Sequence, residues 1–75
     1  MIVWEGAEDD KTAIVGSYML RVEQMDENRY WWAVYFLTEQ IASDMMIGKW
    51  ASIMEKGQMH CIREMVAHKR QNEKN

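Results

Sequence analysis

The chain has only one cysteine, Cys61, among its 75 residues. A single thiol excludes an internal disulfide, and the lack of a cysteine pair argues against a zinc site. No apolar run approaches the roughly 20 residues that a membrane span requires. The first residues, MIVW, are followed by acidic residues, whereas an export signal needs basic residues and then a long apolar stretch. We therefore expect a soluble protein of a reducing compartment, the cytoplasm.

The chain is also short of residues with which to build a core. We expect residues 1–75 to make a single small domain, and a domain of this size buries only about 60% of the surface that its unfolded chain exposes. Small domains compensate with disulfides, metals or oligomerisation, and of these oligomerisation is the one that the composition leaves open.

Basic residues are scarce in the first part of the chain. Residues 1–48 hold nine acidic residues against three Lys/Arg, whereas residues 49–75 hold three against six. The acidic part argues against a general nucleic-acid binder, because phosphate contacts need a basic footprint. The basic part coincides with an expected helix, whose dipole favours cations near its C-terminus without any partner.

Two apolar segments flank an acidic turn. Thr12–Gln24 and Arg29–Leu37, RYWWAVYFL, are each typical of a strand. Between them, Met25–Asn28 has the residues of a turn, with Asn28 suited to a left-handed conformation. If the loop is residues 26–28, it sets the register of a β-hairpin. The facing pairs are Val22 with Trp32, Leu20 with Val34, and Tyr18 with Phe36. A one-residue slip would exchange the roles of Trp31 and Trp32, and we prefer the first register because it joins apolar residues to each other.

This register divides the hairpin into two faces, because side chains alternate along a strand. The first face is apolar and carries Ile14, Tyr18, Leu20, Val22, Trp32, Val34 and Phe36. The reverse face carries Met19, Arg21, Glu23, Trp31, Ala33 and Tyr35. Gly16 interrupts the first face, as a bulge or a close backbone approach would.

The second half of the chain predicts a helix. Residues 39–47 fit a third strand from Ile41 to Ile47 or, with Thr38 as its N-cap, a helix; we favour the strand because Gly48 follows. Ser52 and Glu55 form a capping box that opens a helix to about Arg70. Its apolar stripe is Met54, Gln58, Cys61, Ile62, Met65 and Val66. Gly57 beside this stripe would let the helix approach the sheet closely, and residues 70–75 are expected to be a disordered polar tail.

These elements predict an α+β fold. An antiparallel sheet of three to four short strands, with Ile2–Trp4 as a possible edge strand, would carry one C-terminal amphipathic helix on one face. The helix would cover the first face of the hairpin. Its stripe leaves nothing obvious to cover the reverse face, which holds the large aromatic residues Trp31 and Tyr35 where a polar surface is usual.

Two short motifs support a resemblance. Trp32-Ala33-Val34-Tyr35 and Ile41-Ala42-Ser43, with Ser52 opening the helix, match a pattern in which a W-x-V hairpin strand precedes I-A-S-G and a terminal helix. Over residues 18–70 the chain resembles small orphan accessory proteins of phages and mobile elements, with Asp44 in place of the usual glycine. In size and acidity it is similar to the anti-CRISPR class of inhibitors. The resemblance implies a phage-type protein that sterically blocks a host protein complex in the host cytoplasm; it identifies no functional residue.

Candidate catalytic and metal-binding residues are few. His60, Glu64 and His68 recur every four residues beside Cys61, but the first and third lie about 12 Å apart along a helix, too far for one ion. Cys61 falls in the apolar stripe, which indicates a packed core thiol rather than a nucleophile. The carboxylates at Glu23, Asp26, Glu27, Glu39 and Asp44 imply no pocket. We expect no enzymatic activity, no cofactor and no metal.

The reverse face is the candidate partner-binding site, because Trp, Tyr and Arg are enriched at interface hot spots. The residues proposed for it are Trp31, Tyr35, Met19, Arg21 and Glu23. The alternative is that residues 1–4 or 41–50 fold over it. Eight methionines, five of them at positions 45, 46, 54, 59 and 65, fit either a loosely specified core or a binding surface. Other possible functions are a structural homodimer and a single-strand nucleic-acid module that stacks bases on Trp31 and Tyr35, with Arg21, Arg29 and Lys69-Arg70 on phosphates.

Overall fold

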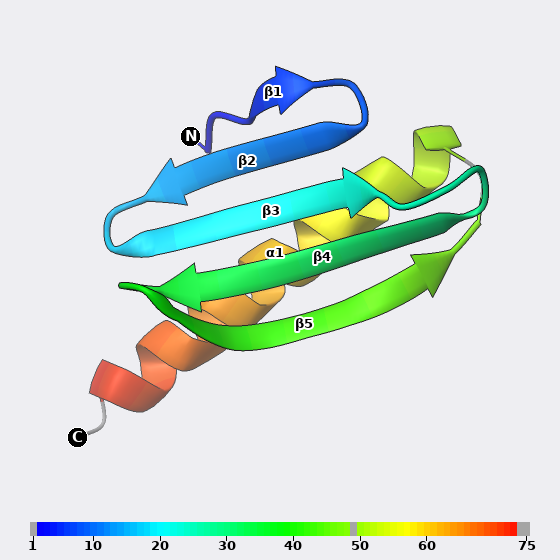
Figure 1. Cartoon of the computed structure of the whole chain (residues 1–75). Helices are drawn as coiled ribbons and strands as arrows, with labels where there is room; N and C mark the ends of the chain where they lie inside the picture. Colours follow the sequence, from blue (N-terminus) through cyan, green and yellow to red (C-terminus); the bar gives the residue numbers. More distant parts are fainter. Residues whose placement is uncertain (1, 49, 74–75) are drawn as a thin grey trace.

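In the computed structural model, which describes residues 2–48 and 50–73, five antiparallel strands form one sheet in chain order and a long helix follows (Figure 1). The elements are β1 (Glu5–Ala7), β2 (Asp10–Val15), β3 (Tyr18–Gln24), β4 (Arg29–Phe36), β5 (Glu39–Ile47) and α1 (Trp50–Glu73). Each strand pairs with the next through a tight turn, so the sheet is a meander. The predicted α+β class is confirmed, but the sheet has more strands than the three to four expected.

The extra strands come from the segment before Gln24. The prediction of one strand over Thr12–Gln24 is wrong, because the chain reverses at Gly16 and Ser17, where Gly16 adopts a φ of +61° that glycine accepts without strain. The two-residue turn places Ile14 opposite Met19. Ile14 therefore lies on the reverse face rather than beside Tyr18, and it is 67% exposed.

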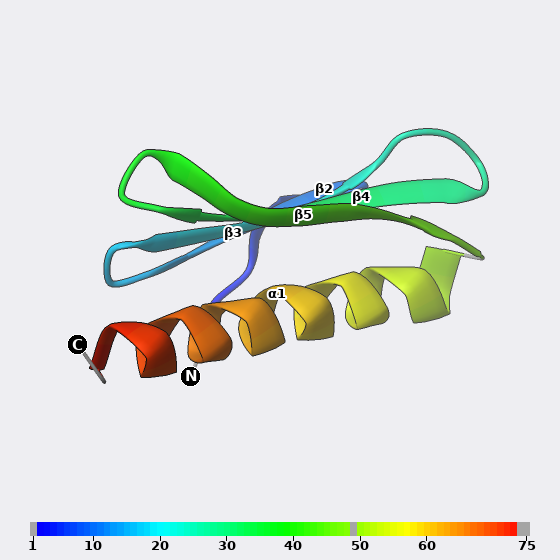
Figure 2. The same cartoon turned by 90° about the horizontal axis from the view of Figure 1, so that it is seen from below.

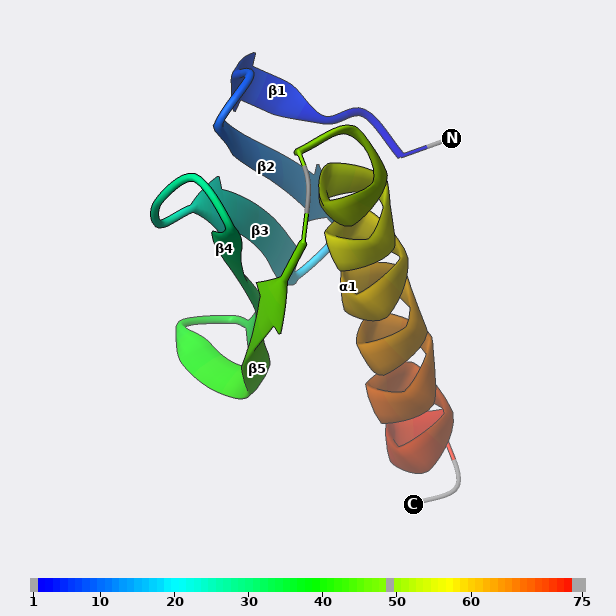
Figure 3. The same ribbon diagram turned by 90° about the vertical axis from the view of Figure 1, so that its right-hand side faces the viewer.

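The N-terminal segment also differs from the expectation. Residues 2–4 form no strand, and the edge strand β1 begins at Glu5. Ile2 and Trp4 are partly buried against the hydrophobic core, and the segment leads from β1 towards the helix side of the sheet (Figure 3). It therefore does not cover the reverse face.

The β3–β4 register is the one that the sequence predicts. Val22 pairs with Trp32, Leu20 with Val34, and Tyr18 with Phe36. The expected left-handed Asn28 is wrong, since Leu37 is the non-glycine residue of the described chain with a positive φ. Instead the Asp26 carboxylate accepts hydrogen bonds from the backbone N–H groups of Asn28 and Arg29, each at 3.0 Å. These bonds, with that from the Arg29 side chain, lower the pKa of Asp26.

The segment that was ambiguous in sequence is a strand. β5 runs antiparallel to β4 after a turn at Leu37 and Thr38. Val34 pairs with Ala42 and Tyr35 with Gln40, so Ile41 is the extra residue of a β-bulge.

Helix α1 begins at Trp50, two residues before Ser52, so the capping box does not mark its start. It continues to Glu73, into the segment expected to be a polar tail, of which residues 74–75 lie outside the described chain. No helix in the described parts of the chain is both long and apolar enough to cross a membrane.

The core lies between α1 and one face of the sheet (Figure 2). From the helix it includes Ile53, Met54, Cys61 and Met65; from the sheet it includes Ala13, Tyr18, Leu20, Val22, Tyr30, Trp32 and Val34. The helix therefore covers the predicted face. Figures 2 and 3 show no described element over the opposite face, which we call the open face.

Candidate protein-binding face

The open face can be followed strand by strand, because residues that pair across strands share a face. One row consists of Ala7, Asp10, Glu23, Trp31 and Met45. The next consists of Glu5, Thr12, Arg21, Ala33 and Ser43. A third consists of Ile14, Met19, Tyr35 and Gln40. The five residues predicted for the site therefore lie together on the open face.

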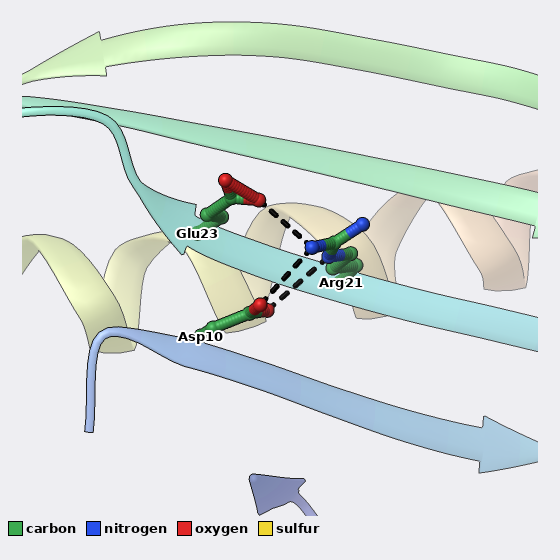
Figure 4. Close-up of polar contacts among 3 residues, drawn as sticks. All are labelled: Asp10, Arg21 and Glu23. Atoms are coloured by element: carbon green, nitrogen blue, oxygen red, sulfur yellow. Dashed lines mark hydrogen bonds and ion pairs between the residues drawn. The ribbon is translucent and has the colours of Figure 1, made fainter. Parts of the chain in front are cut away.

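Arg21 occupies the middle of this face and is held by two carboxylates (Figure 4). Its Nε and Nη2 donate to the two Asp10 oxygens at 3.2 and 3.0 Å, and Nη2 also donates to Glu23 Oε2 at 2.8 Å. The hydrogen bond to Asp10 raises the pKa of Arg21 against the opposing effect of desolvation. The side chains are 33–41% exposed, so these ion pairs contribute more to orientation than to stability.

The aromatic residues lie next to this ion-pair cluster. The Arg21 guanidinium carbon is 6.0 Å from the centroid of the Trp31 ring, at the limit of a cation–π contact. Trp31 and Tyr35 are half-buried, although α1 lies on the other side of the sheet. Between them Ala33 has no exposed surface. The two aromatic side chains of the open face are therefore partly covered by their neighbours and partly accessible to solvent.

Three exposed apolar residues of this face were not among those proposed for the site, although Met45 was named as one of the methionines that fit a binding surface. Ile14 is 67% exposed, Met45 51% and Ile47 79%. Met45 pairs with Trp31 and Ile47 with Arg29, so both extend the apolar area to the outer strand. The Gly-Ser pair at 16–17 is the sequence signal that would have placed Ile14 correctly.

A hollow of about 510 Å³ lies on the part of the open face that β1, β2 and β3 form. It is lined by Glu5, Gly6, Ala7, Asp10, Thr12, Met19 and Arg21. This volume is within the range of ligand-binding clefts, roughly 300–1,000 Å³. Glu5 and Asp10, which no sequence pattern groups together, bring carboxylates to its wall.

The free edge of β5 is partly blocked. Gly48 N–H donates to Asn28 O at 2.9 Å, and hydrogen-bonded pairs alternate along an antiparallel ladder. The backbone groups of Ser43, Met45 and Ile47 therefore point away from β4. The Asp44 carboxylate accepts the Met45 N–H at 2.7 Å, which removes one donor from the free edge and places a charge there.

The helix residues considered for chemistry do not converge. His60 stacks on Trp32 with ring centroids 5.4 Å apart and planes 6° apart, whereas His68 Nδ1 lies 2.8 Å from the Tyr18 hydroxyl. No group of three potential metal-ligating side chains is found among the described residues. Cys61 is buried beneath the sheet, as predicted, and its thiol donates to Arg21 O and Ala33 O at 3.6 Å. Burial raises the pKa of this thiol to about 12, which is far from that of a nucleophilic cysteine.

Comparison with known proteins finds no matching family model, no matching curated protein and no matching solved structure.

Proposed function

We propose that the protein is a non-enzymatic binding module that docks a partner protein on its open face. The observation that carries the proposal is an apolar and aromatic area, formed by Trp31, Tyr35 and Met45, on a sheet face with no described element over it. The opposite face of the sheet holds the core. An antiparallel sheet with one covered face normally has a polar reverse. Here Trp31, Tyr35 and Met45 occupy that reverse, and contiguous apolar area of this kind marks interaction sites.

The ordering of the face favours binding. Arg21 is already fixed by Asp10 and Glu23, so docking orders few additional side chains and loses less conformational entropy. A centre of Trp, Tyr and Arg with exposed Met and Ile around it has the composition of an interface hot spot.

Single-strand nucleic-acid binding has less support. Arg21 and Arg29 are each paired with carboxylates, with which phosphates would have to compete. Lys69 and Arg70 lie on α1, on the far side of the sheet from Trp31 and Tyr35. A role in blocking a host complex, as an anti-CRISPR-like phage protein does, rests on the sequence resemblance alone.

A photo-crosslinking experiment tests the proposal. A benzophenone amino acid replaces Met45 on the open face or, as a matched control, Met59 on the outer surface of α1; the two methionines are 51% and 58% exposed. In cells that make the protein, we expect a defined protein adduct on irradiation from position 45 and none from position 59. An adduct with a second copy of the chain would replace the partner proposal by the homodimer, and no adduct from position 45 would overturn both.

Two variants test whether the adduct depends on the face. Trp31→Ala combined with Tyr35→Ala should abolish the adduct made from position 45. Because both rings are half-buried, this pair also costs stability. Ile14→Gln changes an exposed side chain instead and adds no charge; it should weaken the adduct while the thermal unfolding midpoint stays unchanged. An adduct of full yield in Ile14→Gln would contradict docking on this face.

A further inference from the structure

The open face has two unlike halves. The side formed by β1, β2 and β3 carries Glu5, Asp10 and Glu23 around Arg21, whereas β4 and β5 carry Trp31, Tyr35, Met45 and Ile47. The three carboxylates and one guanidinium of the first half have a formal charge of −2. A partner that covers the face must be complementary to the acidic half as well as to the apolar half.

The internal cations do not neutralise the acidic half. Residues 1–48 contain Lys11, Arg21 and Arg29 as their only Lys/Arg. Arg29 pairs with Asp26 in the β3–β4 turn. Lys11 pairs in register with Val22 and so points to the helix side. Of these three basic residues, Arg21 is therefore the one available to neutralise the acidic half of the face, and two carboxylates share it.

The carboxylates retain capacity to accept hydrogen bonds. Arg21 bonds both oxygens of Asp10 but only Oε2 of Glu23, and Glu5 has no ion-pair partner among the described residues. Glu5 and Asp10 line the hollow that has Met19 and Arg21 in its wall. An apolar partner would dehydrate these charges without pairing them, which is unfavourable.

We infer that the partner presents a cationic segment to the open face, with a Lys or Arg side chain seated in the hollow that Glu5 and Asp10 line and apolar side chains on Trp31, Tyr35 and Met45. Glu23, the cross-strand neighbour of Asp10, adds a carboxylate next to the hollow. The aliphatic stem of such a cation packs on Met19 while its charged end reaches the carboxylates. Opposite charges would also accelerate the encounter at low salt. This inference rests on the proposed function and adds the chemistry of the partner to it.

Selection from a random peptide library tests the charge independently of the natural partner. Yeast displaying random 15-residue peptides are sorted against the full chain biotinylated at its C-terminus, in 50 mM NaCl. Peptides retained by the wild-type chain but lost with Met45→Ser, which removes apolar area without adding a charge, are those that use the open face. We expect this set to be enriched in Lys and Arg next to apolar residues and depleted in Asp and Glu.

The synthetic versions of these peptides are then measured against charge variants. Glu5→Gln combined with Glu23→Gln should weaken binding by about tenfold or more, and raising NaCl to 300 mM should weaken it similarly. Glutamine at position 23 keeps an oxygen for Arg21, and Glu55→Gln on the exposed surface of α1 is the matched control, expected to change nothing. Open-face peptides that lack basic residues, or that bind the double variant equally well, would overturn the inference and leave the proposed function standing. If no peptide depends on the open face, both fail.

Discussion

Gly57 of helix α1 lies against Val22 of strand β3, so close that a Cβ added to the glycine would be 2.8 Å from Val22 Cγ1. The same atom would be 2.8 Å from Met46 Cε. Val22 has no exposed surface, and its branched side chain has few rotamers available. The glycine therefore sets the distance between helix and sheet, as the sequence predicted.

Gly57→Ala should destabilise the protein despite a better helix propensity. Alanine gains about 1 kcal/mol in an open helix position, but overpacking a core costs typically 1–3 kcal/mol. We expect a net loss on the order of 1 kcal/mol in urea denaturation. In a Val22→Ala background the clash with Val22 is gone and only the flexible end of Met46 has to move, so the same change should become stabilising. An increase of stability in both backgrounds would show that the contact does not limit the approach of the helix.

Cys61 should make stability depend on pH in the alkaline range. Its pKa is raised from 9.0 to about 12 by burial, so the unfolded chain loses the thiol proton first. The stabilisation is fully present below pH 9 and falls by about 1.4 kcal/mol per pH unit as pH rises from 9 towards 12. We expect the urea midpoints of the wild type and Cys61→Ala, measured from pH 8 to 11, to differ by a constant amount below pH 9. Above pH 9 the difference between them should shrink. A difference between the two variants that stays constant up to pH 11 would contradict the raised pKa of the buried thiol.

Replacing Tyr30 with phenylalanine should make the protein more stable. Its hydroxyl is buried and has no hydrogen-bond partner within the described residues. Tyr30→Phe removes an unpaired polar group and should stabilise by about 1 kcal/mol, or several degrees in the thermal midpoint. Tyr18→Phe is the control, because the Tyr18 hydroxyl lies 2.8 Å from His68 Nδ1, and it should lower the midpoint. A loss of stability in both variants would mean that the Tyr30 hydroxyl has a partner after all.

The central hairpin could be predicted because its pattern and its turn agree. The apolar alternation on either side of Asp26 allowed one register that joins apolar residues to each other, and β3 and β4 adopt it. The β2–β3 turn was missed because Gly16 and Ser17 sit inside a continuous alternation. A two-residue turn keeps the alternation in the sequence while it exchanges the faces, which is why Ile14 was assigned to the wrong one.

The part of the candidate site that lies on this hairpin could be predicted from the sequence. Its residues share a face because they alternate with the core residues of the same two strands; they are Met19, Arg21, Glu23, Trp31 and Tyr35. Asp10 and Glu5 come from strands with no apolar pattern; β1, Glu5-Gly6-Ala7, has none of the β-branched or aromatic residues typical of strands. The acidic half of the face therefore depended on pairing that only the structure supplies.

Asp44 should limit self-association through the free edge of β5. Its carboxylate accepts the Met45 N–H at 2.7 Å, at a point where the ladder to β4 leaves backbone groups unpaired. Asp44→Ala exposes that donor and removes the charge, so we expect the weight-average mass in sedimentation velocity at about 100 μM to rise above that of the wild type. Asp44→Asn keeps an acceptor oxygen without the charge and separates the two effects: a wild-type mass would assign the protection to the hydrogen bond, and an increased mass to the charge. If Asp44→Ala sediments as the wild type does at every concentration, the edge is protected by other means, such as the bulge at Ile41.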